Sequence, residues 1–420
     1  MLFKGKIVSK RPIHWAWVVL GSSFITLFIT YSIRIGAYSV LLPEMIKDLQ
    51  ITKAQAGMIK SAFSLVYLLL APLMGWLTDR IGGRRVISFF CLFLGAGTFL
   101  MGKAENLAGS VIFYSIVGIG AAATWVPIAT IIQSWFGIRK RGFALGLLSS
   151  SYGLGYGLMG LILPAIVLRY NWRVGWFILG IAGFSLFVLN GLFVREQPQK
   201  MGLSPWGGSL EDRKEVTRSS QSRGYAEILK RGRFWVIGIS YFAIAYGTYA
   251  VVDFIVTYGV MELKIPYQTA SLFITVLAFA GIPGGILIMF LSDHIGRKKS
   301  LVIIQALIAL TVLFVIFWGK TTSLLMVGMG CFGFFYAPIF PMYAACVRDY
   351  FAKEITGTVL GLMTIFYGVG MMVSPALTGH LADVTGSFRW SFGLGALTAF
   401  VAAIVIGFLR RPRESGEKGD

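Results

Sequence analysis

Twelve apolar segments separated by polar ones constrain this chain more than any other feature of its sequence. They fall at residues 15–42, 55–77, 86–102, 108–134, 142–168, 173–194, 234–260, 268–292, 299–319, 323–347, 356–381 and 388–409. At a rise of 1.5 Å per residue, helices of these lengths can cross a hydrocarbon core of about 30 Å. Hydrophobic residues make up 56% of the chain and charged residues only 13%, which excludes a soluble protein of this length. The sequence therefore predicts an all-α membrane protein with twelve transmembrane helices.

A polar stretch after the sixth apolar segment divides the chain into two parts. Residues 195–233 are rich in Pro, Gly, Ser and Arg, a composition typical of linkers. We predict an N-terminal six-helix bundle at 1–194, a cytoplasmic linker at 195–233, a C-terminal six-helix bundle at 234–409 and a cytoplasmic tail at 410–420.

The basic residues of the chain predict its orientation in the membrane. Most of the 38 Lys and Arg residues fall on the side of the N-terminus, beginning with Lys4, Lys6, Lys10 and Arg11. Because cytoplasmic loops carry an excess of Lys and Arg, we expect both termini to be cytoplasmic in a multi-pass protein of the cell membrane. The net charge of +20 comes from short clusters between apolar runs, which excludes a nucleic-acid-binding face.

Two loop motifs occur once in each half of the chain. Gly75-Trp-Leu-Thr-Asp-Arg-Ile-Gly-Gly-Arg-Arg85 returns as Ser292-Asp-His-Ile-Gly-Arg-Lys-Lys299, and each copy joins one apolar segment to the next. Trp135-Phe-x5-Gly-x3-Gly146 returns as Tyr350-Phe-x5-Gly-x3-Gly361. The repeat predicts two pseudo-symmetric six-helix halves.

The first motif resembles the loop between the second and third helices of the major facilitator superfamily. The chain departs from that pattern at Gly83, where the family most often has Arg, and at Met289, where it has Gly. The resemblance implies a substrate site between the two halves, near the midplane of the membrane. The charged loop residues lie far from that plane, so we assign them to conformational switching: Asp79, Arg80, Arg84, Asp293 and Arg297. A carboxylate at this position can also accept hydrogen bonds from the N-terminus of the next helix.

A narrower resemblance covers residues 118–180. The segment Trp135–Gly146 and the tripeptide Asn171-Trp-Arg173 are similar to bacterial relatives of oxalate/formate exchangers and monocarboxylate transporters. This resemblance implies a monocarboxylate substrate. Those relatives tend to carry a cation in the eighth or eleventh helix, but residues 268–292 and 356–381 contain neither Lys nor Arg.

Arg34 is the basic residue in the middle of the first apolar segment. An Arg at the centre of a transmembrane helix costs at least about 2.5–3.5 kcal/mol, so it is expected to face protein or water and to bind substrate. Its place before Pro43 is similar to that in organic-anion and organophosphate symporters of the same superfamily.

Asp253 is the one carboxylate within an apolar segment, and it lies at about the depth of Arg34 in the equivalent helix. Two interpretations are open for this pair. In the first, Arg34 binds an anion and Asp253 takes a proton. In the second, the two residues form a gate salt bridge between the halves. Lys60, near the outer end of the second helix, is expected to extend toward the membrane surface.

Aromatic residues at helical spacing are expected to line a narrow, amphipathic cavity together with Arg34. They are Tyr31, Tyr38, Trp125, Tyr152, Tyr249, Tyr336 and Tyr367. Such a cavity suits a small organic anion better than a sugar, which needs many amides, and the chain has only Asn106, Asn171 and Asn190.

The sequence thus predicts a secondary active transporter that moves a small organic anion, a monocarboxylate, by proton symport or anion exchange. The alternative is a proton-coupled exporter of an amphipathic or cationic solute, with Asp253 as the binding charge. A membrane sensor is disfavoured, because neither tail is long enough for a signalling domain. The three His residues are too scattered for a metal site or a catalytic triad, so no enzyme activity, cofactor or metal is expected. The expected partners are the anion, protons or a counter-anion and the lipid bilayer, and we expect a monomer.

Overall fold

The computed structural model describes residues 14–208 and 228–410. The first half consists of α1 (Trp15–Tyr31), the π-helical turn η1 (Ser32–Ala37), α2 (Tyr38–Leu49), α3 (Lys53–Ile81), α4 (Gly83–Met101), α5 (Leu107–Ala122), α6 (Trp125–Trp135), α7 (Ile138–Arg169) and α8 (Trp172–Phe193), followed by the short 3-10 helix η2 (Pro198–Met201). The second half consists of α10 (Gly232–Thr257), η4 (Tyr258–Glu262), α11 (Tyr267–Ile295), α12 (Arg297–Trp318), α13 (Thr322–Tyr336), α14 (Ile339–Tyr350), α15 (Lys353–Thr385) and α16 (Phe388–Gly407).

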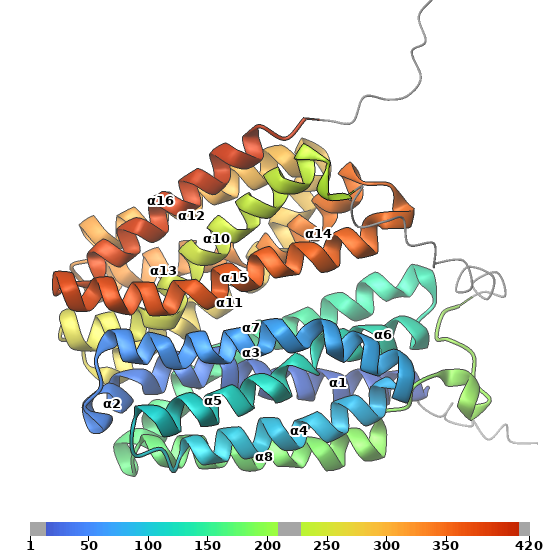
Figure 1. The fold of residues 1–420 in the computed structure, drawn as a ribbon, viewed down its shortest axis with the longest axis horizontal. Coiled ribbons are helices and arrows are strands. Elements are labelled where there is room, and N and C mark those ends of the chain that lie inside the picture. The colour runs from blue at the N-terminus through green and yellow to red at the C-terminus, as the bar shows by residue number, and fades with distance from the viewer. Residues whose placement is uncertain (1–13, 209–227, 411–420) are drawn as a thin grey trace, which may run out of the picture.

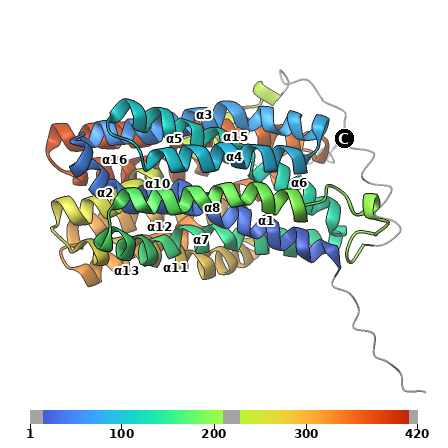
Figure 2. The ribbon, with the colours of Figure 1, turned by 90° about the horizontal axis from the view of Figure 1, so that it is seen from below.

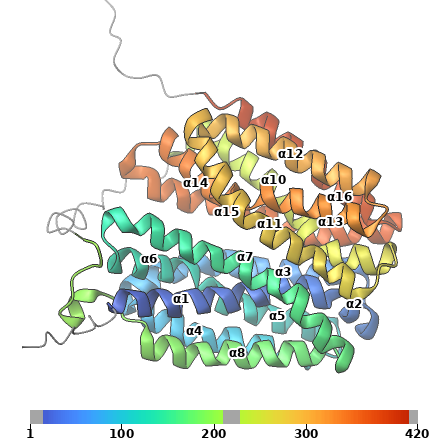
Figure 3. The same ribbon diagram turned by 180° about the vertical axis from the view of Figure 1, so that it is seen from behind.

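The described residues form twelve helical spans long and apolar enough to cross a membrane, which confirms the predicted fold class. Figures 1 and 3 show the two halves lying side by side, with α1 to α8 in one and α10 to α16 in the other. Figure 2 shows that the helices run roughly along the same direction, as they must to span one bilayer. The first span is longer than predicted, because it continues through Pro43 to Leu49 instead of ending at residue 42.

The two halves repeat each other in local geometry as well as in sequence. The fourth and tenth spans are each interrupted, between α5 and α6 and between α13 and α14. The equivalent loop residues Gly82 and Gly296 both have φ +90° and ψ 143°, a conformation that favours glycine. The predicted domain boundaries stay predictions. The basic cluster at Lys4–Arg11, the Ser/Arg run at 218–223 and the tail from 411 lie outside the described residues.

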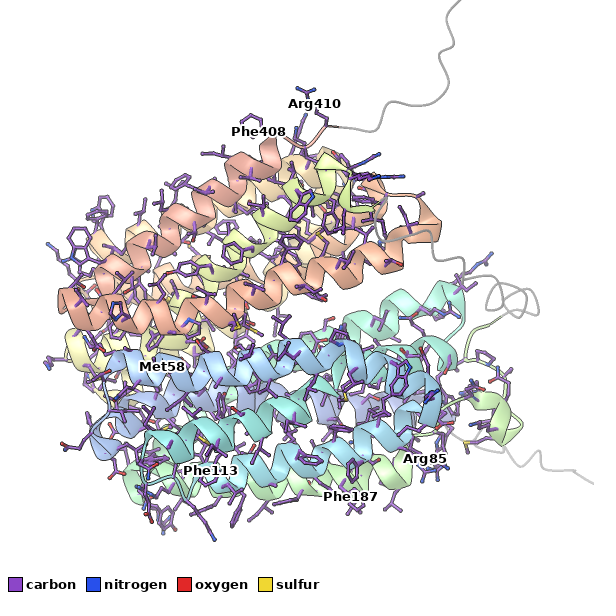
Figure 4. The ribbon with its side chains drawn as sticks, in the orientation of Figure 1. Met58, Arg85, Phe113, Phe187, Phe408 and Arg410 are labelled. Carbon is purple, nitrogen blue, oxygen red and sulfur yellow. The ribbon has the colours of Figure 1, made fainter. Side chains whose placement is uncertain are left out.

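The two ends of the bundle differ in how the halves meet. We call the end with the loop between α3 and α4 the linker end, and the opposite end, where α2 is joined to α3, the distal end. In Figure 4 Arg85 marks the linker end of the first half, and Met58 lies on the distal part of α3. The hydrogen bonds recorded between the halves use the distal parts of the helices, as in Ser39 Oγ to Val252 O at 2.9 Å and Tyr267 Oη to Val40 O at 3.0 Å.

Glycines show the same asymmetry between the two ends. A methyl group at Gly57 would stand 2.1 Å from the carbonyl oxygen of Pro375, so α3 and α15 touch through backbone at the distal end. Methyl groups at the four glycines of the repeated Gly-x3-Gly motif would meet nothing within 4 Å: Gly142, Gly146, Gly357 and Gly361. The halves are therefore closed together at the distal end, and the linker parts of α7 and α15 are unpacked at these positions.

The N-terminus of α3 is completed by the other half of the molecule. A helix begins with four backbone N–H groups that have no partner within the helix. Thr52 and Gln55 form a capping box that satisfies the N–H groups of both residues. Asp383 of α15 accepts the remaining two, from Lys53 N at 3.1 Å and Ala54 N at 2.8 Å. This carboxylate therefore joins the halves at the distal rim.

We predict that Asp383→Ala weakens distal closure. Loss of a helix cap typically costs about 1 kcal/mol, which would shift the ratio of distal-closed to distal-open molecules by roughly fivefold. Distance distributions between spin labels at Lys47 and Val384 would report this shift. The control is Glu105→Ala, which removes an exposed distal carboxylate with no recorded hydrogen bond in the described chain. Equal distributions in the two variants would contradict the prediction.

Candidate functional site

The first span changes from α-helix to π-helix at the turn that carries Arg34. In η1 the Tyr38 N–H donates to the Ile35 carbonyl, and not to the Arg34 carbonyl four residues back. The Arg34 carbonyl instead accepts hydrogen bonds from the Lys60 ammonium and from the Tyr114 hydroxyl, the latter at 3.2 Å. A π turn within a helix is a common feature of functional sites, because it frees backbone groups and redirects side chains.

The Arg34 guanidinium lies among aromatic rings and one sulfur atom. Its central carbon is 4.9 Å from the ring centre of Tyr31 and 4.8 Å from that of Tyr67, and Nη2 is 3.4 Å from the Met371 sulfur. The residue is 6% exposed, and its Nε has no hydrogen-bond partner among the described residues. Ring faces stabilise the charge without using its N–H donors fully, and sulfur is a weak acceptor. The guanidinium therefore keeps donors for an anion.

A buried ion pair joins the two halves next to this site. Lys60 Nζ of α3 is 3.3 Å from Asp253 Oδ1 of α10, with the two side chains 1% and 0% exposed. The ammonium also lies 4.7 Å from the ring centre of Tyr38. Removing two charges from water is costly, so a pair at this depth depends on both partners being present.

The gate salt bridge between Arg34 and Asp253, one of the two interpretations left open by the sequence, is not formed in the described chain, because Asp253 pairs with Lys60 and Arg34 makes no recorded ion pair there. Rise per residue predicts the depth of a side chain but not its direction around the helix axis. The prediction that Lys60 extends to the membrane surface is wrong. Lys60 lies about 10 Å of helix from the start of α3 at Lys53, and this depth is the signal that could have revealed its burial.

Aromatic rings from both halves form a continuous chain beside Arg34. The successive ring-centre distances are Tyr31–Tyr152 4.1 Å, Tyr152–Trp125 5.4 Å, Trp125–Phe340 6.5 Å, Phe340–Tyr367 6.3 Å and Tyr367–Tyr249 6.0 Å. Five of the predicted aromatic residues thus come together, with Phe340 as a member that the sequence analysis missed. Phe340 is 39% exposed although it contacts Trp125 of the other half, so the chain of rings borders open space.

The remaining two predicted aromatic residues differ in position. Tyr336 stacks on Phe332 at 5.8 Å and lies close enough to Tyr367 to interact with it electrostatically. Tyr38 is fully buried, stacks on Tyr114 at 5.2 Å and donates to the Ala56 carbonyl at 2.5 Å. It therefore belongs to the surroundings of Lys60, because the extra residue of a π turn rotates the following side chains by about 100°.

The repeated charged loops at the linker end are not equivalent in this structure. Asp293 forms an ion pair with Arg297 one turn later on the chain. Asp79 has no recorded ion pair or hydrogen bond in the described part of the first half, while Arg84 donates to the Gly191 carbonyl and Arg80 lies over the Trp76 ring. Neither carboxylate accepts a recorded amide hydrogen bond from the next helix, so that expectation is wrong for the described residues.

A cavity of about 480 Å³ lies at the first of these loops. It is lined by Thr78, Asp79, Arg80, Ile81, Gly82, Gly83, Arg85, Thr130, Ile131, Ser134, Glu196, Gln197 and Lys200. Among the described residues Asp79 is thus an unpaired carboxylate at an open surface, at the end where the halves are not packed together. A carboxylate in this position can gain partners when the linker ends close.

Comparisons with known proteins agree with this architecture. A family model described as the Major Facilitator Superfamily matches residues 19–289 and 254–420. The probable sulfoacetate transporter SauU of Cupriavidus necator is 24% identical over 419 residues, which cover 95% of each protein. The hexuronate transporter of Bacillus subtilis (strain 168) is 26% identical over 89% of this chain and 90% of that protein.

A solved structure has the same fold. It is a bacterial homolog of the human lysosomal transporter Spinster, in an inward-facing and unoccupied conformation, with a TM-score of 0.73 at 16% sequence identity. The superposition covers 95% of this chain and 96% of that one. The narrower resemblance to oxalate/formate exchangers and monocarboxylate transporters stays a prediction, since none of these four matches tests it.

We predict that Asp79→Asn slows transport and leaves equilibrium substrate affinity nearly unchanged. Asp79 follows Lys60 by about 28 Å of helix, so it cannot contact a ligand at Arg34. Loss of one charge-assisted hydrogen bond in the state whose linker end is closed would slow the turnover by about tenfold. Rates and affinities would be measured on the same purified preparation. Asp349→Asn, at an exposed carboxylate at the linker end, is the control, and loss of binding in folded Asp79→Asn protein would refute the assignment.

Proposed function

Because this chain belongs to the major facilitator superfamily, and is thus a membrane transporter and not an enzyme, we propose that it moves a small organic anion by alternating access. We assign the substrate to the monocarboxylates and the coupling to proton symport or anion exchange. The observation that carries the proposal is the Arg34 guanidinium, which is buried between the halves without a carboxylate partner in the described chain.

Arg34 matches a carboxylate in charge and in shape. A guanidinium presents its donors in a planar fork that can bind both oxygens of one carboxylate. The contact with Met371 comes from the other half, so an anion at this place would touch residues of both halves. A ligand bound between two halves that move relative to each other can favour one arrangement over the other, which alternating access requires.

The net charge of the site supports a single anionic group. Lys60 and Asp253 offset each other at 3.3 Å, which leaves one positive charge, on Arg34. The chain of aromatic rings offers apolar faces for the body of the substrate. A monoanion with a small apolar body satisfies both features.

The amide side chains support the same substrate class. Asn106 and Asn171 cap the N-termini of α5 and α8, and Asn190 is buried in a hydrogen bond with Thr26. Gln305 donates to the Tyr343 hydroxyl inside the second half. These amides are therefore engaged in the helices themselves and are not free to bind the hydroxyl groups of a sugar.

The relatives support an anionic substrate in general. One is named for sulfoacetate and the other for hexuronate. The alternative of a cationic or amphipathic solute bound by Asp253 is less well supported, because Lys60 already occupies that carboxylate.

We further propose that the linker end faces the cytoplasm and that the protein works as a monomer in the cell membrane. The basic residues Arg80, Arg84 and Arg85, together with Arg297 and the following lysines, gather at that end. With this orientation, the structure is closed at its distal end and open toward the cytoplasm.

Substitution of Arg34 tests the anchor. Arg34→Ala is expected to abolish anion binding, and Arg34→Lys to weaken it by about tenfold or more, because Lys keeps the charge but loses the paired geometry. Equilibrium binding of a labelled monocarboxylate to purified protein would measure both effects. Arg169→Ala, at an exposed distal Arg, is the matched control. Wild-type affinity in Arg34→Ala would remove this residue from the site.

Uptake into proteoliposomes tests the substrate class and the mode of transport. We expect accumulation of a labelled monocarboxylate, driven by an inward proton gradient or by exchange with anion inside, and little uptake of glucarate or of an organic cation. Accumulation of the cation under an outward proton gradient would support the exporter alternative. Binding of the anion without any uptake or exchange would identify a sensor and contradict transport.

A further inference from the structure

Lys60 contacts the carboxylate of Asp253 and the backbone of Arg34. Its ammonium is 3.3 Å from Asp253 Oδ1 and donates a hydrogen bond to the carbonyl of Arg34. The Phe63 ring is close to both cations: its centre is 5.4 Å from Lys60 Nζ and 5.8 Å from the central carbon of Arg34. One lysine thus connects a carboxylate of the second half to the residue that we propose as the anion anchor of the first.

Asp253 is the only carboxylate in this cluster of described residues. The ionisable groups that face it are Lys60 from α3, Arg34 from η1, Tyr38 from α2, Tyr114 from α5 and Tyr249 from its own helix α10. Neither Asp253 oxygen has a hydrogen-bond partner of good geometry in the described chain. Its charge is therefore compensated mainly by Lys60.

We infer that Lys60 couples a proton on Asp253 to anion binding at Arg34. When a proton from the aqueous phase binds an Asp253 oxygen, the ion pair is lost and Lys60 becomes a second uncompensated cation beside the anchor. Lys60 keeps its own protons throughout and retains its hydrogen bond to the Arg34 carbonyl. The inference rests on the proposed function, since it requires that Arg34 binds the anion.

The charge of the site explains why proton and anion would travel together. With Asp253 ionised, two cations and one anion give a net charge of one. With Asp253 protonated and a monoanion bound, two cations and one anion again give a net charge of one. Protonation of Asp253 alone would raise the net charge of the buried site to two, which is expensive in a low-dielectric interior. A bound monoanion lowers that charge to one again, so a protonated site favours anion binding.

The chemistry of lysine fits this role. An ammonium carries three donors on a flexible four-carbon stem, so it can leave Asp253 for a substrate oxygen and keep one bond to the Arg34 carbonyl. The π turn makes that bond available, because the Arg34 carbonyl accepts side-chain donors there. A purely structural gate pair would need no such link to the anchor residue.

Lys60→Met tests the coupling against the gate interpretation. In wild-type protein anion affinity should rise as the pH falls, because proton and anion bind together. In Lys60→Met this pH dependence and the pH-driven accumulation should disappear, affinity should fall by about tenfold or more, and exchange of anion should continue. Lys103→Met, at an exposed distal lysine, should behave as wild type.

Two further variants keep the test decisive if Lys60→Met fails to fold. Lys60→Met combined with Asp253→Asn removes both buried charges, and it should exchange anion with a pH-independent affinity and without accumulation. Lys60→Arg should retain part of the pH dependence. Normal pH-driven accumulation in the double variant would overturn the coupling role.

The outcomes also separate this inference from the proposed function. Loss of binding in Arg34→Ala together with wild-type pH dependence in Lys60→Met would retain the anion site and overturn the coupling by Lys60. Recovery of accumulation in the double variant Lys60→Asp and Asp253→Lys would identify a gate pair that works with its two charges exchanged. This outcome would also overturn the coupling role of Lys60. Wild-type binding in Arg34→Ala would instead refute the proposed function itself.

Discussion

The cost of burying charge in an apolar bundle determines the arrangement of this site. Three ionic groups lie between the halves in the described chain, and each is stabilised in a different way: Arg34 by ring faces, Lys60 by a carboxylate and a carbonyl, and Asp253 mainly by Lys60. None of these groups can hydrate freely, so a change in one changes the stability of the others. The pair that joins the halves and the anchor for substrate are therefore a single electrostatic unit.

Sequence patterns predicted the fold well because the membrane leaves few alternatives. Apolar length sets the spans, and the repeated Asp-Arg-Ile-Gly and Asp-His-Ile-Gly loops indicate two equivalent halves. The main error was the end of the first helix, which was placed before Pro43. Proline removes one backbone donor, but neighbouring groups in a bundle can satisfy the freed carbonyl, so the helix continues to Leu49.

The site was harder to predict, because contacts depend on direction around each helix axis. Residue type and spacing predicted that Arg34 and five aromatic residues lie together, and their role in binding stays a prediction. The partner of Asp253 was not predicted, since the sequence contains no sign of the π turn that frees the Arg34 carbonyl for Lys60. One inserted residue also redirected Tyr38 from the ring chain to the lysine. Phe340 was missed because a Phe in an apolar span is indistinguishable from ordinary packing.

The shared N-terminus of α3 has a consequence for the order in which the distal side separates. The two amides that Asp383 holds lie at the end of a helix, where water can replace the carboxylate as soon as the halves move apart. The Lys60–Asp253 pair lies about two turns deeper, so water from the distal side can hydrate it only after the distal ends of the halves have separated. Separation should therefore begin at the distal rim and proceed inward. Water would reach the buried pair before its two charges move apart, so this pair would break last and in a hydrated environment.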